Sequence, residues 1–252
     1  MKAWLSFLGR SAGRLAGQGL DLVCPPRCVF CRADVPEPAR GPAVVCDACA
    51  RRFASDVSRC LACGAPASSA ADCRRCHGRC RDWDGIAVLS AYADDLRSTV
   101  LAAKRPGGEI LAAGLAALLA RKHAEQIAAW GIDLLVPVPM HWTRRMRRGT
   151  SAADGLARGM AAALSLPRRA ALVRTRATPM QNELEPVARR ANVRDAFRAS
   201  AVAAGRRVLV VDDVTTTGGT LAACRAALVA AGAAAVYAAA VARADAAESP
   251  AA

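Results

Sequence analysis

The run Val208-Leu-Val-Val-Asp-Asp-Val-Thr-Thr-Thr-Gly-Gly-Thr220 joins three features that together indicate a ligand. An apolar strand, predicted over 207–211, ends in the adjacent carboxylates of Asp212 and Asp213. A loop of threonine and glycine follows, and a helix is predicted to begin at Gly219. Small residues let backbone N–H groups approach a phosphate, and the start of a helix favours an anion. Because carboxylates would repel that phosphate, we expect them to accept hydrogen bonds from the neutral hydroxyls of a sugar. The run therefore predicts a site for a sugar phosphate.

Six residues of this run are candidate ligand contacts, because their backbone N–H groups or hydroxyls can donate to phosphate oxygens. They are Thr215, Thr216, Thr217, Gly218, Gly219 and Thr220. The simpler alternative is that the aspartates and threonines only form a turn and a helix cap. An isolated Asp-Asp pair would favour that alternative. The strand, the carboxylate pair, the loop and the helix in direct succession favour the ligand site.

On either side of this run, predicted strands alternate with predicted helices. We expect strands over 86–92, 133–138, 171–174 and 234–241, and helices over 94–104, 109–130, 143–166 and 219–231. A polar loop is predicted over 175–186, with a short helix from there to Phe197. Such alternation is typical of an α/β fold with a parallel sheet covered by helices. Ligands of these sheets bind beyond the carboxyl ends of the strands, which is where the carboxylate pair falls.

The sequence before this region is rich in cysteine. Ten of the 11 cysteines lie between Cys24 and Cys80, and eight of them form four Cys-x-x-Cys pairs. Each such turn can direct two thiolates at one point, and two turns complete the tetrahedral set that zinc prefers. We therefore predict two structural zinc ions, with the ligands Cys28, Cys31, Cys46, Cys49, Cys60, Cys63, Cys73 and Cys76.

Three points about these cysteines stay open at this stage. An iron–sulfur cluster or unliganded thiols are alternatives to zinc. The four pairs can combine sequentially or in a crossed arrangement. Cys24, Cys80 and His77 are spare ligands close by, with ordinary loop positions as the alternative. Cys224 lies far away in a predicted helix, and we expect it to be a buried core thiol.

The chain is strongly basic. It has 35 Lys and Arg against 21 Asp and Glu, a formal net charge of +14. An excess of positive charge favours phosphate-bearing partners such as nucleotides and nucleic acid, although arginine use typical of a whole proteome would give the same excess. Aromatic residues make up only 4% of the chain, so side chains for stacking on single-stranded DNA are scarce. The candidates are Trp83, Trp142, Phe30 and Phe53, and packing in the core or at a hinge explains each of them better.

No stretch of the sequence predicts a membrane span or a secretory signal. The longest uncharged stretch, 226–242, is mostly alanine and contains Gly232, so it lacks the run of about 20 strongly apolar residues that a span needs. The apolar segment at the start of the chain is interrupted by Arg10 and Arg14. We expect a short amphipathic helix over 1–23 and a cytoplasmic protein.

The run over 208–220 resembles the signature of type I phosphoribosyltransferases, which bind phosphoribosyl pyrophosphate. Together with the cysteine pairs it resembles the ComF family, which is linked to DNA uptake and natural transformation in bacteria. Three further segments resemble that family in the right order. They are Tyr92 and Leu96 leading to Lys104, then Val136-Pro-Val-Pro139 followed by Arg144, Arg145, Arg148 and Gly149, and then Thr178-Pro-Met-Gln181 with Arg189, Asn192, Val193 and Phe197.

The resemblance implies further contacts and a second metal. Lys104, Arg145 and Arg148 would steady the pyrophosphate, and Gln181 and Arg189 would reach the ligand from a covering loop. Asp212 and Asp213, as the candidate catalytic residues, would hold the ribose while positive charge develops at its anomeric carbon. Mg²⁺ would accompany the ligand, bound through waters and substrate oxygens.

The chain also departs from its presumed relatives. Purine-salvage relatives carry an aspartate as candidate base where this chain has Thr216, and Thr150, Ser151 and Ala152 follow the Arg-Gly pair. The acceptor of any ribosyl transfer therefore stays unidentified. The prediction is a ComF-like protein that binds a sugar phosphate, with phosphoribosyl transfer as a candidate activity and a role in DNA uptake beside DNA-processing proteins. The alternative is a non-catalytic factor that binds single-stranded DNA or protein on the same scaffold.

The predicted architecture is an α/β fold of the type I phosphoribosyltransferase kind, with a small N-terminal zinc-ribbon domain. We place an N-terminal helix over 1–23, a double zinc-ribbon domain over 24–82, a phosphoribosyltransferase-like domain over 83–245 and a flexible tail over 246–252. Composition shifts from cysteine and short loops to long runs of alanine and leucine near Asp82 to Gly85, which fixes the main boundary.

Overall fold

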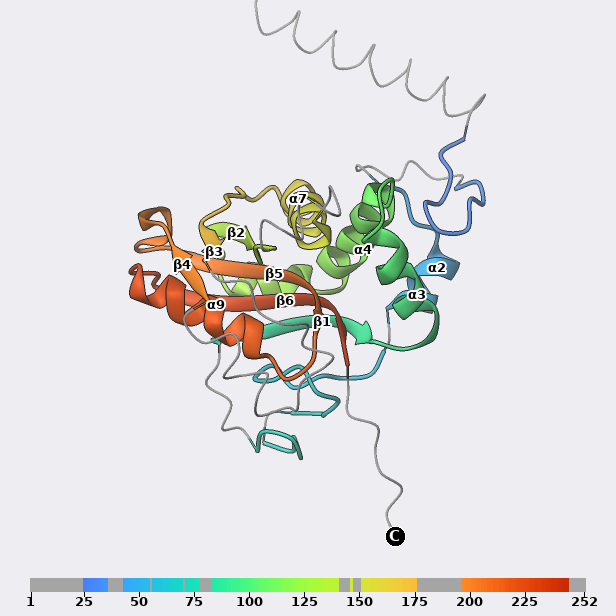
Figure 1. Ribbon diagram of the computed structural model, residues 1–252. Coiled ribbons are helices and arrows are strands. Elements are labelled where there is room, and N and C mark those ends of the chain that lie inside the picture. Colours follow the sequence, from blue (N-terminus) through green and yellow to red (C-terminus); the bar gives the residue numbers. More distant parts are fainter. Residues whose placement is uncertain are drawn as a thin grey trace, which may run out of the picture.

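The computed structural model describes residues 25–35, 43–54, 56–69, 71–77, 83–140, 146, 151–175 and 196–244. The helix predicted over 1–23 and the tail predicted over 246–252 lie outside these residues. Two short cysteine-containing segments precede a larger body of strands and helices (Figure 1).

A parallel sheet of four strands forms the centre of the larger body. Its order is β1 (Ile86–Ala91), β6 (Ala235–Arg243), β5 (Arg207–Thr215) and β2 (Leu134–Pro137), and every neighbouring pair is parallel. The sequence-based expectation of an α/β fold with a parallel sheet is therefore confirmed. Since all four strands run the same way, their carboxyl ends meet at one edge.

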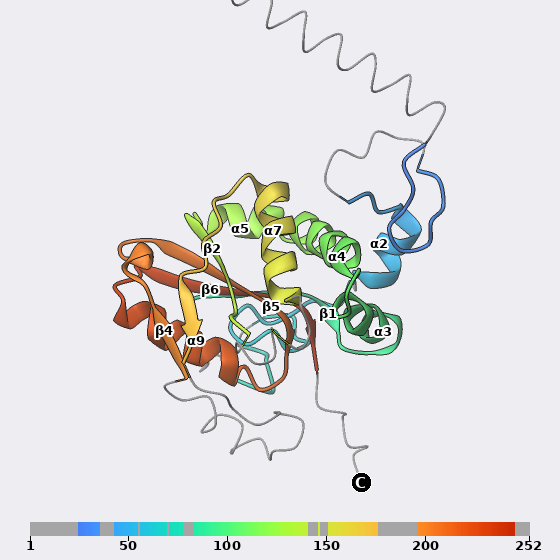
Figure 2. The same cartoon turned by 45° about the horizontal axis from the view of Figure 1, so that its top comes forward.

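Consecutive apolar residues of the strands face opposite sides of the sheet, so a separate hydrophobic core lies on each face. On β5, Leu209 and Val211 face one core, while Val208 and Val210 face the other. Such an alternation follows from the two-residue period of a strand whose faces are both covered. Helices α3 (Asp94–Ala103), α4 (Glu109–Lys122), α5 (Ala124–Ala129) and α7 (Ala152–Leu164) cover the first face. Helix α9 (Gly219–Ala230) covers the second (Figure 2).

Helices α4 and α7 approach each other closely because small residues line their contact. A Cβ atom added to Gly159 would lie 2.6 Å from the Cβ of Ala116, and one added to Gly155 would lie 3.3 Å from the Cβ of Ala112. Real Cβ atoms do not approach other atoms as closely as 2.6 Å, so glycine is needed at position 159. The two helices lie side by side over the sheet (Figure 2).

Several predicted boundaries differ from the observed ones. The helix predicted over 109–130 divides at His123, whose ring contacts Gln126 Oε1 at 2.6 Å and the Val88 carbonyl at 3.0 Å. The contact with Val88 fixes the break between α4 and α5 against strand β1. Of the helix predicted over 143–166, the described part consists of the helical residue Met146 and of α7, which begins at Ala152 and ends at Leu164. Ser151 caps it by accepting a hydrogen bond from the Asp154 N–H.

The prediction that a short helix extends to Phe197 is wrong at that residue. Phe197–Ala199 forms strand β4, which pairs antiparallel with β3 (Leu172–Arg174). The Phe197 ring is buried, with the Arg174 guanidinium 5.4 Å from its centroid. A strand of three residues is too short for its alternation to be visible in a sequence. Most of the polar loop predicted over 175–186 lies outside the described residues.

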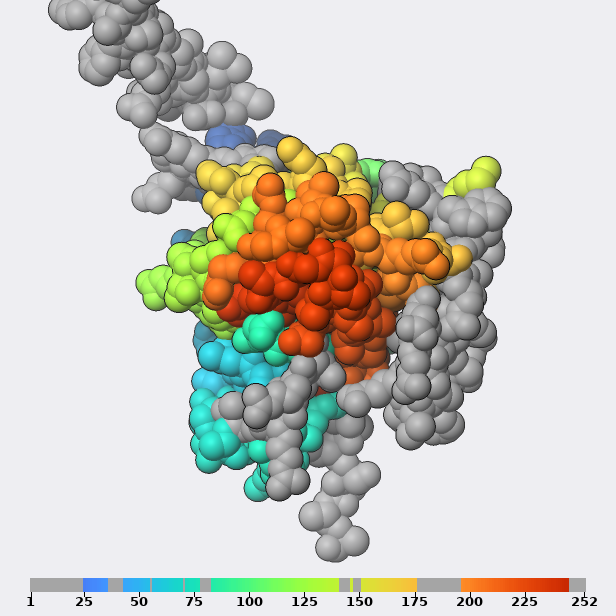
Figure 3. Space-filling view, turned by 90° about the vertical axis from the view of Figure 1, so that its left-hand side faces the viewer, coloured from blue at the N-terminus to red at the C-terminus, as the bar shows by residue number. Residues whose placement is uncertain are grey.

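The two cysteine-containing segments occupy different sides of the sheet. The first cysteine unit (25–35 and 43–54, including helix α2, Asp47–Phe53) packs against α3 and α4. A Cβ atom on Gly114 of α4 would lie 2.5 Å from Val29. The second cysteine unit (56–69 and 71–77) lies by β1, below the strand in the view of Figure 1. In Figure 3 the cyan and teal surface that includes this unit lies below the red surface of the C-terminal part of the chain.

Candidate functional site

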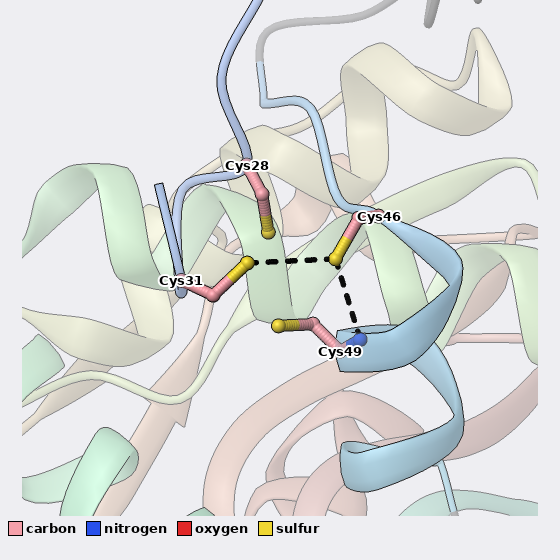
Figure 4. Close-up of side chains that lie close together, drawn as sticks. All are labelled: Cys28, Cys31, Cys46 and Cys49. Atoms are coloured by element: carbon pink, nitrogen blue, oxygen red, sulfur yellow. Dashed lines mark hydrogen bonds between the residues drawn. The ribbon is translucent and has the colours of Figure 1, made fainter. Parts of the chain in front are cut away.

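The first cysteine unit brings four sulfurs to one point. Cys28, Cys31, Cys46 and Cys49 have sulfurs within 4.8 Å of one another, and they converge on a common centre (Figure 4). The Sγ atoms of Cys31 and Cys46 are 3.6 Å apart, and the Cys49 N–H donates to Cys46 Sγ at 3.4 Å. Cys46 is also the N-cap of α2, so the helix fixes the spacing of the second pair.

The second cysteine unit repeats the arrangement with Cys60, Cys63, Cys73 and Cys76. The Cys60 and Cys76 sulfurs are 3.6 Å apart, and those of Cys63 and Cys73 are 3.5 Å apart. Sulfurs about 2.3 Å from a tetrahedral zinc ion lie about 3.8 Å from one another, so both sets fit zinc. The pairing is the sequential one, and all eight predicted ligands fall in these two groups.

In each unit, the first Cys-x-x-Cys turn is followed by a residue with positive φ. In the first unit this residue is Arg32 at φ 62°, and its N–H donates to the Cys28 carbonyl. In the second unit it is Gly64 at φ +76°, which donates in the same way to Cys60. The left-handed backbone curls the turn, so both thiols project to the same side.

The thiols of each unit differ in acidity because of their surroundings. Burial opposes ionisation of Cys28, but N–H groups of Cys31, Cys46 and Phe30 lower its pKa to about 6. Backbone N–H groups outweigh burial at Cys73 as well, and its pKa falls to about 7. Burial and neighbouring thiols raise the pKa of Cys49 and Cys63 well above the usual value. The charge of a bound dication is what would let all four thiols of a unit ionise together.

The spare ligands have different outcomes. His77 is exposed and belongs to neither group of four, and its N–H donates to the Cys73 carbonyl. Cys24 and Cys80 lie outside the described residues. Cys224 is fully buried on α9, as expected, and burial raises its pKa.

The carboxylate pair lies at the carboxyl edge of the sheet, but within the strand rather than after it. Strand β5 was predicted to end at Val211, and it continues to Thr215 because Asp212, Val214 and Thr215 pair with β6. Asp213 is close to Lys104, the residue that follows α3, with Nζ 3.0 Å from Oδ1. The fold thus brings together two residues that sequence analysis assigned to one site from motifs more than 100 positions apart.

The two carboxylates share a crowded site, and this raises the pKa of one of them. Burial first, and then the charge of Asp213, raise the pKa of Asp212 to about 7. The Asp213 N–H, which donates to Asp212 Oδ1 at 2.9 Å, acts in the opposite direction, as do the charges of Lys104 and Arg174. Asp212 is therefore able to gain or lose a proton near neutral pH.

The loop after β5 has the small residues and the helix start that the sequence predicted. Thr215 is 3% exposed, and its Oγ1 has no hydrogen-bond partner among the described residues. Gly218 has φ +80°, a left-handed conformation that favours glycine. Gly219 begins α9, so the loop leads directly into the helix. Thr216, Thr217 and Thr220 lie in the same run.

The other predicted contacts lie outside the described residues. These are Arg145, Arg148, Gln181 and Arg189, together with Trp142. The aromatic candidates that are described serve packing. The rings of Phe30 and Phe53 pack against each other in the first cysteine unit, with centroids 4.7 Å apart and planes tilted by 60°, and Trp83 is buried.

Three residues near the site were missed or not assigned to it. Arg174 on β3 affects the charge state of Asp212. Arg243 ends β6 and is 1% exposed, and Trp83 packs under Gly218. A single arginine closing the apolar run 235–242 was a signal for the buried position of Arg243. A cavity of about 420 Å³ lies elsewhere, between the first cysteine unit and α3.

Comparisons with known proteins give two matching families. The family described as "Phosphoribosyl transferase domain" matches residues 107–251, and the family described as "Double zinc ribbon domain" matches residues 19–77. The first match contains Asp212, Asp213 and the loop after β5. The second contains all eight cysteines of the two units.

Relatives of similar length carry one name. The DNA utilization protein YhgH of Escherichia coli is 32% identical over 194 residues, 75% of this chain and 84% of that protein. Proteins of the same name from Shigella flexneri and Salmonella typhimurium are 31% and 32% identical over the same shares. Among the described residues, no helix is both long and apolar enough to cross a membrane.

Proposed function

Because this chain belongs to the ComF family, which joins a double zinc ribbon to a phosphoribosyltransferase domain, we propose that it binds phosphoribosyl pyrophosphate with Mg²⁺ at the carboxyl end of β5. The observation that carries the proposal is the succession of Asp212, Asp213 and a threonine-glycine loop that opens into α9, with Lys104 beside it. That arrangement places acceptors for sugar hydroxyls next to donors for phosphate.

The donors of the site face the phosphate end of the proposed ligand. The backbone N–H groups at the start of α9 have no partner within the helix, so they can donate to phosphate oxygens. The buried Thr215 hydroxyl, which lacks a hydrogen-bond partner among the described residues, is a further donor at the mouth of the loop. Lys104, which follows α3, contributes a positive charge.

The acceptors of the site face the ribose. Asp212 and Asp213 accept hydrogen bonds from its hydroxyls, and their negative charge favours the positive charge that grows at the anomeric carbon during ribosyl transfer. Lys104 already contacts Asp213, so it can move between that carboxylate and the pyrophosphate. In the transfer, the bond from the anomeric carbon to pyrophosphate breaks as the bond to an acceptor forms.

The carboxylate oxygens of Asp212 and Asp213 also suit the magnesium ion that accompanies such ligands. Carboxylate oxygens are hard ligands, and Mg²⁺ keeps much of its water while it bridges carboxylates and substrate phosphates. Asp212 and Asp213 would hold it through its bound waters, and the ion would supply positive charge to the leaving pyrophosphate.

The place of this binding in the cell is proposed from the relatives. Three of them are named DNA utilization proteins, and we extend a role in DNA uptake and use, in the cytoplasm, to this chain. Its net charge of +14 favours contact with DNA beside any DNA-processing partner. The second candidate function, a DNA-binding factor without turnover, rests on that charge.

Calorimetric titration of the zinc-loaded protein with phosphoribosyl pyrophosphate and Mg²⁺ tests the proposal. We expect binding that the variant Asp212→Ala/Asp213→Ala weakens at least about tenfold, because it removes the ribose acceptors. The control is Asp94→Ala/Asp95→Ala, which removes the same charge at the other adjacent aspartate pair of the chain. Absence of binding by folded wild-type protein would overturn the proposal and favour the DNA-binding alternative.

Turnover is measured in the same samples. Release of pyrophosphate on addition of an acceptor candidate, absent from the Asp212→Ala/Asp213→Ala variant, would make the protein a transferase. Binding without release would make it a protein that senses or holds the ligand. For the DNA role, affinity for single-stranded DNA that falls steeply with salt is the supporting result.

A further inference from the structure

The second cysteine unit is joined to the candidate ligand loop through a buried arginine. Arg243 is 1% exposed, and its Nη1 donates to the carbonyl of Cys63 at 2.6 Å. The same residue lies opposite Thr215 in the pairing of β5 with β6. The next N–H along the chain, that of Ala244, donates to the Thr215 carbonyl at 2.8 Å. One residue therefore contacts a metal-binding turn on one side and the first residue of the loop on the other.

The turn that holds Cys63 is itself fixed against the sheet. The Ile86 N–H at the start of β1 donates to the Leu61 carbonyl at 2.9 Å. Gly64 sits over the same strand, since a Cβ atom there would lie 2.9 Å from Val88 Cγ2. This contact is so close that the position of the turn and that of β1 are set together.

The loop receives two more contacts from the same direction. Arg75, between the cysteines of the second pair, has Nη2 placed to donate to the Thr216 carbonyl at 3.4 Å. Trp83 follows the unit along the chain, and its indole lies directly under Gly218. A Cβ atom on Gly218 would be 2.5 Å from Trp83 Cη2. Arg75 and Trp83 thus contact the two ends of the segment Thr216–Gly218.

The first cysteine unit has the same ligand set but different neighbours. Its contacts are with α3 and α4, through Gly114 and through the ion pair of Arg52 with Asp95. Among the described residues, none of the polar contacts found for the first unit reaches positions 212–220. The two units therefore differ in whether they touch the loop.

We propose that the second cysteine unit holds the segment 215–220, from the end of β5 to the start of α9, in the conformation that binds phosphate, so that metal at the second site, and not at the first, sets the affinity for phosphorylated ligands. Arg243, Arg75 and Trp83 are positioning residues in this arrangement. Loss of the metal releases the turn that carries the Cys63 carbonyl, and the buried Arg243 guanidinium then loses this contact. The part that concerns affinity rests on the proposed function of the loop.

The two units provide a matched experiment in the full-length protein. One variant is Cys73→Ser/Cys76→Ser, and its control is Cys46→Ser/Cys49→Ser, the same change in the other unit. Each variant should bind one zinc ion where the wild type binds two. Hydrogen exchange at the amides of 214–222 is measured without ligand, and affinity for phosphoribosyl pyrophosphate with Mg²⁺ is measured by calorimetry.

We expect exchange over 214–222 to be at least about tenfold faster in Cys73→Ser/Cys76→Ser and unchanged in the control. Affinity should fall at least about tenfold in the first variant and by less than about twofold in the control. Equal effects of the two variants on loop exchange, or none, would overturn the proposal. If the wild type binds no phosphoribosyl pyrophosphate, the proposed function fails, while the exchange measurement still decides whether the second unit holds the loop.

A milder pair of variants separates positioning from general loss of structure. Arg75→Ala removes the contact with the Thr216 carbonyl, and Arg74→Ala removes the same charge from the neighbouring exposed position. We expect Arg75→Ala to lower affinity by about threefold with both zinc ions and the melting temperature retained. Arg74→Ala should have no effect, and Arg75→Lys should restore part of the affinity. The same affinity change in both alanine variants would assign the effect to charge alone and would count against positioning.

Discussion

The two cysteine units have nearly the same ligand geometry and opposite surroundings. The first packs its aromatic rings against the helical face of the body, at α3 and α4. The second presents a backbone carbonyl to a buried arginine at the carboxyl edge of the sheet. The ligand set therefore indicates which metal is bound, while the groups outside it decide which part of the protein depends on that metal.

The largest effect on stability is expected from a substitution that disrupts the packing of the first unit against α4. Gly114→Val places side-chain atoms where Val29 and Phe30 already lie, since even a Cβ would be 2.5 Å from Val29. We expect a loss of about 3 kcal/mol in the free energy of unfolding, typical of overpacking. Chemical denaturation measures it. Affinity for the phosphorylated ligand should be unchanged, and a parallel loss of affinity would show that both units serve the loop.

A second substitution tests the link between the second unit and the sheet. Arg243→Met keeps much of the side-chain volume and removes the donor to the Cys63 carbonyl. We expect a loss of about 2 kcal/mol in stability, because a buried acceptor is left without its partner. Zinc content should stay at two ions. Unchanged stability together with unchanged loop exchange would show that the arginine does not connect the two regions.

The pH dependence of binding distinguishes the carboxylates from the second unit. Since burial and Asp213 raise the pKa of Asp212 to about 7, its ionised fraction increases as pH rises through neutrality. Affinity for the ligand with Mg²⁺ should therefore increase about tenfold between about pH 6 and about pH 8. In Asp212→Asn the dependence should be flatter. Variants of the second unit should lower affinity by the same factor across this range.

The same shift has a consequence for stability. A carboxyl whose pKa is raised in the folded protein binds more protons there than in the unfolded chain, between the ordinary value of 3.8 and about 7. Its contribution is present at low pH and is lost as pH rises through about 7. Asp212→Asn should remove this part of the decline, which denaturation at a series of pH values can measure.

The smallest effect compares the equivalent turns of the two units. Arg32 and Gly64 hold the same position and both have positive φ. Arg32→Gly should stabilise the first unit by about 0.5 to 1 kcal/mol, because glycine adopts this conformation without strain. Gly64→Ala should destabilise the second, where strain adds to the contact with Val88. Thermal melting of both variants checks the opposite signs.

Sequence analysis located the chemistry more accurately than the connections between its parts. The cysteine spacing predicted all eight ligands, because each Cys-x-x-Cys turn is a local structure that needs few long-range contacts, but how the four pairs combine came only from the structure. The apolar first half of β5 and the helix after it were likewise predicted, since the run of valine and leucine and the glycines before the helix are local signals. The resemblance to a family assigned Lys104 and Asp213 to one site, but it did not predict the ion pair between them.

What sequence could not provide depends on neighbours. Strand β5 continues through polar residues because β6 lies beside it, and no local pattern shows that. Strand β4 has only three residues, so the sequence shows no strand pattern there. Its pairing with β3 explains why Phe197 belongs to a strand and not to the end of the predicted helix. Arg243 could be seen as one charge ending an apolar run, but its acceptor is a carbonyl 180 positions away.

The indole under Gly218 also gives the protein an optical reporter. Trp83 is 6% exposed, and its ring lies against the backbone of the loop, so its fluorescence depends on the position of that backbone. Trp130, the other described tryptophan, stacks on Tyr237 at 4.7 Å, away from the loop. With Trp4 and Trp142 replaced by phenylalanine, emission from Trp83 would follow the arrival of a ligand in real time, without a label and within the mixing time of a stopped-flow instrument.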